Sequence, residues 1–294
     1  MGVIKRLTIG FGMARRSVRV LRSHPKLLVF PLIGGLSGIA FLATLFGSLV
    51  FTGPVFEEPG PALFAALFVA YLVETFVASF FTAALVAATR TAFRGEEPSI
   101  RAALAAAWQR KLPLIVWSVI AAIVGVILRA IESEDNLVAH LLAAVFAVAW
   151  SVMTYFVVPV IVFRNPSITE LFTESARTFK DTWGESIGAM GAIDVVTVLL
   201  ALGGVGLGAI TYVATTGLGT VQLVATLLVG GTAVILGLLV GKALSGIAKT
   251  ALYVYATERT APEHFEDMDF GELGGERSPS TAGLVGGNSG SNRI

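Results

Sequence analysis

Cysteine is absent from the 294 residues of the chain, which excludes disulfides, thiolate metal sites and thiol nucleophiles. Histidine is scarce, and because His24, His140 and His264 stand far apart in the sequence we expect no metal site. The phosphate-binding P-loop, the HExxH zinc motif, the nucleophile elbow of hydrolases and the CxxC pair are missing as well. We therefore predict no cofactor, no metal and no catalytic residues, and a protein that is not an enzyme.

Charge is also in short supply. Charged residues make up 14% of the chain, against roughly 25% in soluble domains, while 55% of the residues are hydrophobic and the mean hydropathy is +0.79. This deficit is expected if most of the chain faces lipid or other membrane helices. The net charge of +1 gives no reason to expect a nucleic-acid partner.

Long apolar runs, in contrast, are abundant. A helix needs roughly 20 apolar residues to cross a bilayer, and six runs reach that length. The last is too long for one straight crossing, so we expect it to tilt, to kink at its glycines, or to project past the bilayer as a polar-ended helix. The runs cover residues 27–51, 61–88, 112–131, 137–163, 186–214 and 221–256. The predicted fold is therefore an all-α polytopic membrane helix bundle with six transmembrane helices and a membrane domain over residues 1–257.

The remaining residues, 258–294, differ in composition from the rest. Acidic residues give way to Gly, Ser and Asn without any periodicity. Such a segment cannot bury enough apolar surface to fold, so we predict a disordered cytoplasmic tail.

Lys and Arg are unevenly distributed between the connections. They gather in the N-terminal segment and in the connections after the second and fourth spans, whereas the alternate connections are acidic or neutral. Because cytoplasmic ends carry the excess of Lys and Arg, we predict a multipass protein of the cell membrane with both termini cytoplasmic. The residues concerned are Lys5, Arg6, Arg15, Arg16, Arg19, Arg22, Lys26, Arg90, Arg94, Arg101, Arg110, Lys111, Arg164, Arg177 and Lys180.

Three stretches before spans, residues 14–33, 100–119 and 171–191, share one pattern. Apolar residues at three- and four-residue spacing face away from basic ones, which predicts an amphipathic cytoplasmic entry helix in each. Ser167 and Glu170 are expected to form a capping box at the start of the third. With the hairpins that follow, the helices would form a weak threefold repeat.

Amphipathic helices of this kind suit the headgroup layer, where arginines meet the phosphates of anionic lipids. Alternatively, they pack against the spans as connectors. We predict membrane lipids as the partners. The candidate headgroup contacts are Arg15, Arg16, Arg19, Arg22, Arg101, Arg110 and Lys111.

Four ionisable residues lie within the predicted spans: Glu74, Asp194, Lys242 and Lys249. Such groups are costly inside a membrane, so each is a functional candidate. A pair between Lys242 and either Glu74 or Asp194 would neutralise both charges. That pair would either be a buried tether between helices or mark a water-filled, ion-conducting path.

Small residues and one proline indicate how the spans pack. The patterns Gly204-x-x-x-Gly208 and Gly237-x-x-x-Gly241 predict close contact between helices within the bundle, and Gly34-x-x-x-Gly38 does the same in the first span. Pro159 should kink the fourth span or end its regular hydrogen bonding.

The stretch from Ser17 to Pro31, with HPKLLVFPL leading into a Gly-rich first span, resembles an uncharacterised family of six-span prokaryotic membrane proteins. It is also loosely similar to the membrane domain attached to some glycerophosphodiester phosphodiesterases. The resemblance implies a six-helix bundle and no established activity. The chain lacks the hydrolase domain of those phosphodiesterases and its metal-binding carboxylates.

Two functional hypotheses follow. The first is a non-enzymatic module that organises lipids or binds a partner protein through its basic cytoplasmic collar. The second is a transporter or channel that uses Glu74, Asp194 and Lys242.

Overall fold

The computed structural model describes residues 3–52, 60–132, 136–164, 166–183, 191–258 and 260–266. Every regular element in these ranges is a helix, as predicted. The elements are α1 (Val3–Ser23), a 3₁₀ turn (Pro25–Leu28), α2 (Val29–Thr52), α3 (Pro61–Ala92), α4 (Ile100–Gln109), α5 (Lys111–Glu132), α6 (Leu137–Thr154), α7 (Val157–Arg164), α8 (Ile168–Trp183), α9 (Gly191–Ala214), α10 (Thr220–Thr226), a π-helical turn (Leu227–Gly231) and α11 (Thr232–Glu258).

Six helical segments of the described chain are long and apolar enough to cross a membrane, which confirms the predicted number. They are Pro25–Ser48, Pro61–Ala92, Lys111–Glu132, Leu137–Arg164, Val195–Ala214 and Thr220–Glu258. The second is longer than predicted because α3 continues for a further turn, where Thr89 and Ala92 are buried. The start of the predicted fifth span, residues 186–190, lies outside the described residues.

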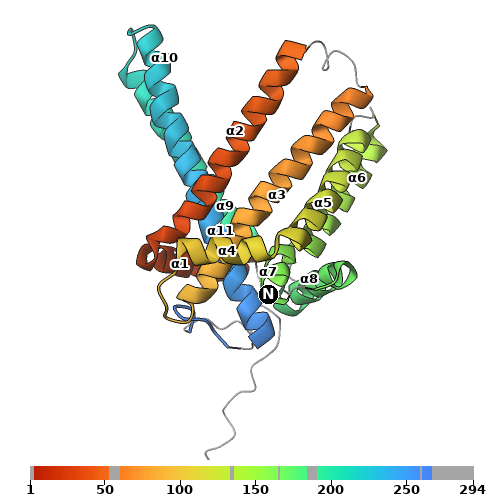
Figure 1. Cartoon of the computed structure of the whole chain (residues 1–294). Helices are drawn as coiled ribbons and strands as arrows, with labels where there is room; N and C mark the ends of the chain where they lie inside the picture. The colour runs from red at the N-terminus through yellow and green to blue at the C-terminus, as the bar shows by residue number, and fades with distance from the viewer. Residues whose placement is uncertain are drawn as a thin grey trace, which may run out of the picture.

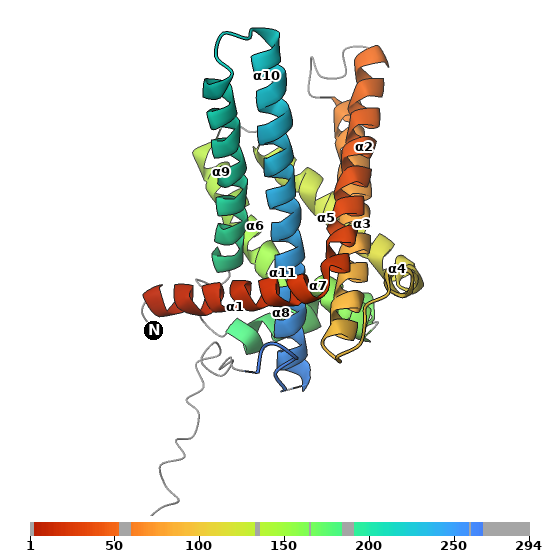
Figure 2. The same ribbon diagram turned by 90° about the vertical axis from the view of Figure 1, so that its left-hand side faces the viewer.

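The spanning helices form two arms that diverge from one end of the molecule (Figure 1). We call the end where the two arms meet the narrow end. One arm consists of α9, α10 and α11, and the other contains α2, α3, α5 and α6. Helix α1 lies across the ends of the spanning helices at the narrow end (Figure 2), and α4 and α8 lie at the same end. The largest fully buried side chains, among them Tyr253, Phe156 and Phe30, belong to this narrow end. The core is therefore concentrated where the arms meet.

The fourth span is broken as Pro159 predicts. Proline cannot donate the hydrogen bond that would reach the carbonyl four residues earlier, and α6 ends at Thr154 just before that position. Helix α7 begins again at Val157. In the gap, the backbone N–H of Phe156 donates a buried 3.1 Å hydrogen bond to Oγ of Ser175 in α8. The backbone N–H that is freed at the interruption is thus satisfied by a side chain of a neighbouring helix.

Glycines allow α9 to pack closely against α11 and the turn before it, which confirms the predicted packing within the bundle. A Cβ atom on Gly204 would lie 2.4 Å from the backbone nitrogen of Val234, and one on Gly230 would lie 2.6 Å from Cα of Gly208. Gly237 and Gly241 face α9 in the same way, against Leu200 and Thr197. The long last span also contains the π-helical turn Leu227–Gly231, which ends in two glycines.

The helices at the narrow end have defined starts. Ser99 caps α4 by accepting a hydrogen bond from the N–H of Ala102 (3.4 Å). At α8 the Glu170 carboxylate accepts hydrogen bonds from both the N–H (3.0 Å) and the hydroxyl (2.7 Å) of Ser167. This is the Glu170 half of the predicted capping box, and the Ser167 hydroxyl, which was predicted to accept from a backbone N–H, donates to the Glu170 carboxylate. The threefold repeat stays a prediction.

The loop between α3 and α4 also ties neighbouring segments together. It turns at Gly95, whose φ of 73° suits a residue without a side chain. Glu97 in this loop accepts a 3.1 Å hydrogen bond from Lys26. Residues 260–266, predicted as the start of the disordered tail, pack here too, because Phe265 is buried against Phe93. The rest of the predicted tail, residues 267–294, lies outside the described residues.

Candidate functional site

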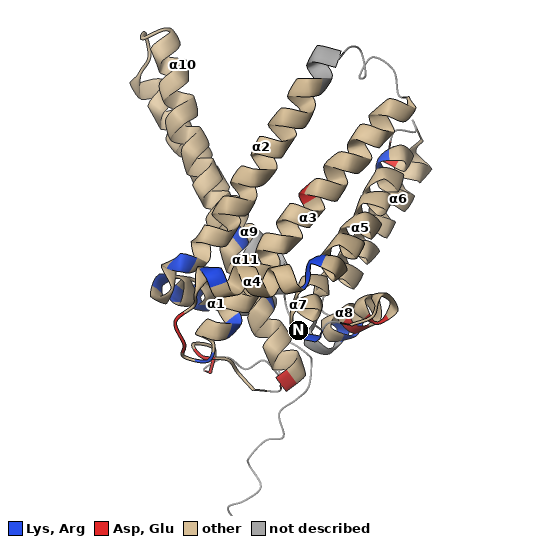
Figure 3. Ribbon diagram, in the orientation of Figure 1, with Lys and Arg blue, Asp and Glu red and all other residues tan. Residues whose placement is uncertain are grey.

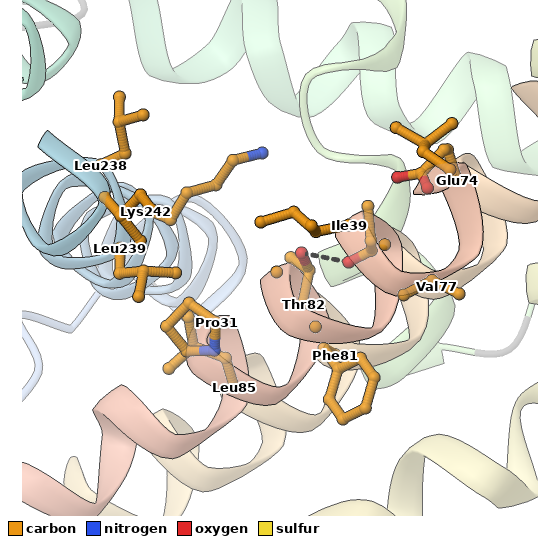
Figure 4. Close-up of a pocket in the computed structure, with 16 residues that line it drawn as sticks. Pro31, Ile39, Glu74, Val77, Phe81, Thr82, Leu85, Leu238, Leu239 and Lys242 are labelled. Atoms are coloured by element: carbon orange, nitrogen blue, oxygen red, sulfur yellow. Dashed lines mark hydrogen bonds between the residues drawn. The ribbon is translucent and has the colours of Figure 1, made fainter. Parts of the chain in front are cut away.

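A groove lies where the two arms separate, between α2, α3 and α11 (Figure 4). Its volume is about 340 Å³. Small residues open it, since Gly34, Gly35 and Gly38 of α2 face it without side chains. Its apolar lining includes Ile39, Leu42, Val77, Phe81, Ile235 and Leu238. The groove brings together two of the four predicted intramembrane charges, Glu74 and Lys242.

Glu74 occupies the α3 wall of this groove at the level of Gly38. A Cβ atom on Gly38 would lie 2.8 Å from Oε2 of Glu74, so a larger residue there would require the carboxylate to shift. The other oxygen, Oε1, is shielded from solvent and has no hydrogen-bond partner among the described residues. A buried acceptor without a partner is costly, so this carboxylate is a group for which the surrounding helices provide no donor.

Lys242 reaches into the groove from the opposite wall, on α11 (Figure 4). Within the described part of the chain its ammonium has no carboxylate within 4.0 Å. Of the two predicted pairs, the one between Glu74 and Lys242 therefore does not form, and the one between Asp194 and Lys242 stays a prediction because the Asp194 side chain lies outside the described residues. The physical reason why Glu74 and Lys242 do not pair is the divergence of the arms, which keeps α11 apart from the middle of α3.

The structure places only one of the other two predicted charges. Asp194 belongs to α9, but its side chain lies outside the described residues. Lys249 lies seven residues after Lys242 on α11, yet its ammonium is 4.3 Å from the centre of the Tyr155 ring at the break in the fourth span. A cation over an aromatic face is attracted by the ring quadrupole, which gives Lys249 a packing role at that break.

The sequence analysis did not identify Thr82 as part of the groove or the place of Gly38 beside the Glu74 carboxylate. Thr82 lines it, but its hydroxyl donates a 2.6 Å hydrogen bond to the carbonyl of Ala78 and is thereby satisfied (Figure 4). Glycines 34 and 38 were predicted to permit close helix packing, and Gly34 does contact Phe81. Gly38, however, makes room for a carboxylate. In the sequence the two residues were noted only separately, Gly38 as part of a glycine pattern and Glu74 as an acidic residue within a predicted span.

A second candidate site lies on α1, where Arg15, Arg19 and Arg22 surround a hollow of about 390 Å³ together with Val18 and Ser23. The three arginines are exposed and form no ion pair with any described residue. They lie on the face of α1 away from Met13, Ser17 and Val20, which are fully buried. Arg16 differs, because it donates a 3.3 Å hydrogen bond to the carbonyl of Gly12.

The remaining predicted headgroup contacts surround the junction of α4 and α5. Arg101 is exposed, Arg110 is half-buried, and the ammonium of Lys111 lies 4.6 Å from the centre of the exposed Trp108 ring. In Figure 3 the Lys and Arg residues gather mostly at the narrow end. At the opposite end of α5, Arg129 pairs with Glu132 at 3.7 Å.

Several carboxylates at the narrow end form ion pairs or hydrogen bonds with nearby residues. Arg164 pairs with Glu174 at 2.7 Å, and Glu97 holds Lys26. The two hydrogen bonds from Ser167 hold the pKa of Glu170 below its ordinary value of 4.5. No group of three or more His, Asp or Glu residues within the described ranges could hold a metal ion.

The helices, the apolar groove and the basic end define a multipass membrane helix bundle. The chain belongs to a family of unknown function, described as "Family of unknown function (DUF6159)", whose model matches residues 61–262. That match confirms the expectation of an uncharacterised family, but it leaves out HPKLLVFPL, the stretch on which the resemblance was based. No curated protein and no solved structure matches the chain. The similarity to glycerophosphodiester phosphodiesterases is not shown by these comparisons.

Proposed function

We propose that this protein is a non-enzymatic module of the cell membrane that binds anionic lipids on its basic collar. The collar is the set of exposed basic residues at the narrow end, with Arg15, Arg19 and Arg22 at its centre. In this proposal both termini are cytoplasmic, because the positively charged connections of membrane proteins stay on that side. Anionic lipids of the cytoplasmic leaflet are then the nearest source of negative charge.

The observation that carries the proposal is the orientation of α1. This helix lies across the spanning helices (Figure 2), and a helix perpendicular to the spans runs in the plane of the membrane. Its buried residues face the bundle, while Arg15, Arg19 and Arg22 point away from it around one hollow. A guanidinium binds phosphate oxygens through two parallel hydrogen bonds, so three of them around one hollow suit a phosphate-bearing headgroup.

The alternative, a transporter or channel, is less well supported. A conducting path needs polar groups or water along its walls, whereas the groove with Glu74 and Lys242 has mostly apolar walls.

The proposal can be tested with the full chain purified in a neutral detergent. Titration with a short-chain phosphatidylglycerol, followed by native mass spectrometry, gives the Kd for an anionic lipid. The change is the joint substitution Arg15→Gln, Arg19→Gln and Arg22→Gln. Each basic residue near a membrane surface contributes about 1 kcal/mol, so the three together should weaken binding roughly 100-fold.

The matched control is Arg129→Gln, at the opposite end of the bundle and paired with Glu132. It should leave the Kd unchanged. Equal affinity of the native chain and the triple variant for phosphatidylglycerol would contradict the proposal.

A further inference from the structure

Two opposite charges face the groove without a partner from the described chain. Oε1 of Glu74 is shielded from solvent and accepts no hydrogen bond, and the ammonium of Lys242 has no carboxylate within reach. In the apolar part of a membrane, unpaired charges are expensive. An occupant that supplies a donor to Glu74 and an anion to Lys242 would compensate both.

The two groups are also separated along the groove. The Glu74 carboxylate lies at the level of Gly38, whereas Leu239 of α11 contacts the Gly35 position, one turn closer to the narrow end. Lys242 follows Leu239 by three more residues in that same direction. At a rise of 1.5 Å per residue, three residues on each helix place the backbone of Lys242 about 9 Å closer to the narrow end than Gly38. The occupant must therefore carry its two charges some distance apart, the anion nearer the narrow end.

The apolar surroundings indicate the rest of the occupant. Where the arms diverge, the side chains of Leu36, Ile39, Ile235 and Leu238 are exposed. Exposed apolar surface of this kind, between helices that cross a membrane, is covered by lipid chains. A molecule that lies in the groove thus has a charged head between Glu74 and Lys242 and apolar chains against these residues.

We propose that the groove binds a zwitterionic phospholipid whose headgroup carries a primary ammonium, as phosphoethanolamine does. The phosphate accepts hydrogen bonds from Lys242, and the ammonium donates to Glu74. A quaternary ammonium has no N–H group and cannot satisfy Oε1 of Glu74, so the site selects the primary amine. This site is separate from the collar, which selects negative charge and needs no amine.

The decisive experiment needs no substitution. The full chain in neutral detergent is titrated with short-chain phosphatidylethanolamine, its mono- and dimethylated forms and phosphatidylcholine, and native mass spectrometry gives each Kd. Affinity should fall at least tenfold at the last methylation, when the final N–H donor is lost. Equal affinity for the dimethylated lipid and phosphatidylcholine would overturn the proposal.

Substitutions then assign the effect to residues. E74Q, which removes the negative charge and leaves a weaker acceptor, should reduce the preference for phosphatidylethanolamine over phosphatidylcholine, and K242M should weaken the binding of both lipids. T82V is the matched control, because Thr82 lines the same groove but its hydroxyl is already bonded to Ala78. It should keep the preference. The thermal unfolding midpoint of each variant shows whether it is folded.

Two further results separate the possible failures. If Glu74 and Lys242 instead pair with each other when the arms close, E74Q and K242M will lower the unfolding midpoint without changing any lipid preference, and the proposal is then wrong. The collar variant with three glutamines should keep the preference for the primary amine. If that variant loses affinity for phosphatidylglycerol alone, the collar and the groove are two sites.

Discussion

At the scale of single residues, the tightest constraint is on the glycines between α9 and α11. Gly204→Ala would place a Cβ atom 2.4 Å from the backbone of Val234, whereas the same atom on the adjacent Gly203 meets nothing within 4 Å. Because the clash is with backbone, the helices must move apart, and overpacking of this kind costs about 1–3 kcal/mol. We expect Gly204→Ala to lower the thermal unfolding midpoint in detergent and Gly203→Ala to leave it unchanged or raise it. Equal midpoints would show that the two helices are not in close contact.

The sequence predicted these glycine contacts because small residues four apart on an apolar helix have few other uses. The pair that it offered between Glu74 and Lys242 does not form. Whether two charges in different spans meet depends on the tilt between those spans. In this fold the arms diverge, which separates the charges. Neither the hydropathy of the spans nor the spacing of residues along them predicts that angle.

At the scale of elements, the break between α6 and α7 depends on α8. Ser175→Ala would leave the buried N–H of Phe156 without its acceptor, and an unsatisfied buried donor costs about 1–3 kcal/mol. We expect a lower unfolding midpoint for this variant. Thr173→Ala on the same helix is the control, because the Thr173 hydroxyl is exposed and bonds only within α8. If both variants unfold at the same temperature as the native chain, Ser175 does not stabilise the break.

Part of this element could be predicted. Pro159 alone indicates that the fourth span is interrupted, since its effect is local to the chain. The hydrogen bond from Phe156 to Ser175 joins residues 19 positions apart. No local pattern identifies the acceptor for a freed backbone N–H, so the role of α8 in the fourth span became visible only in the fold.

At the scale of the whole molecule, hydropathy was sufficient for the number of spans and insufficient for their arrangement. A span needs a certain apolar length whatever it contacts, and lipid-facing and helix-facing positions are both apolar. Composition therefore cannot say which helices are neighbours. It is the contacts, such as α9 with α11 and α3 with α5, that divide the bundle into two arms.

The orientation of the molecule in the membrane is the remaining prediction at this scale. The native chain has no cysteine, so a single introduced thiol reports its own position. Ser23 at the end of α1 and Leu218 between α9 and α10 are both exposed and lie at opposite ends of the bundle. If the basic end is cytoplasmic, a membrane-impermeant maleimide should label Leu218→Cys on intact cells and label Ser23→Cys only after permeabilisation. The reverse pattern would place the collar outside the cell, where the anionic lipids of the cytoplasmic leaflet could not reach it, and both the orientation and the proposed lipid binding would then be wrong.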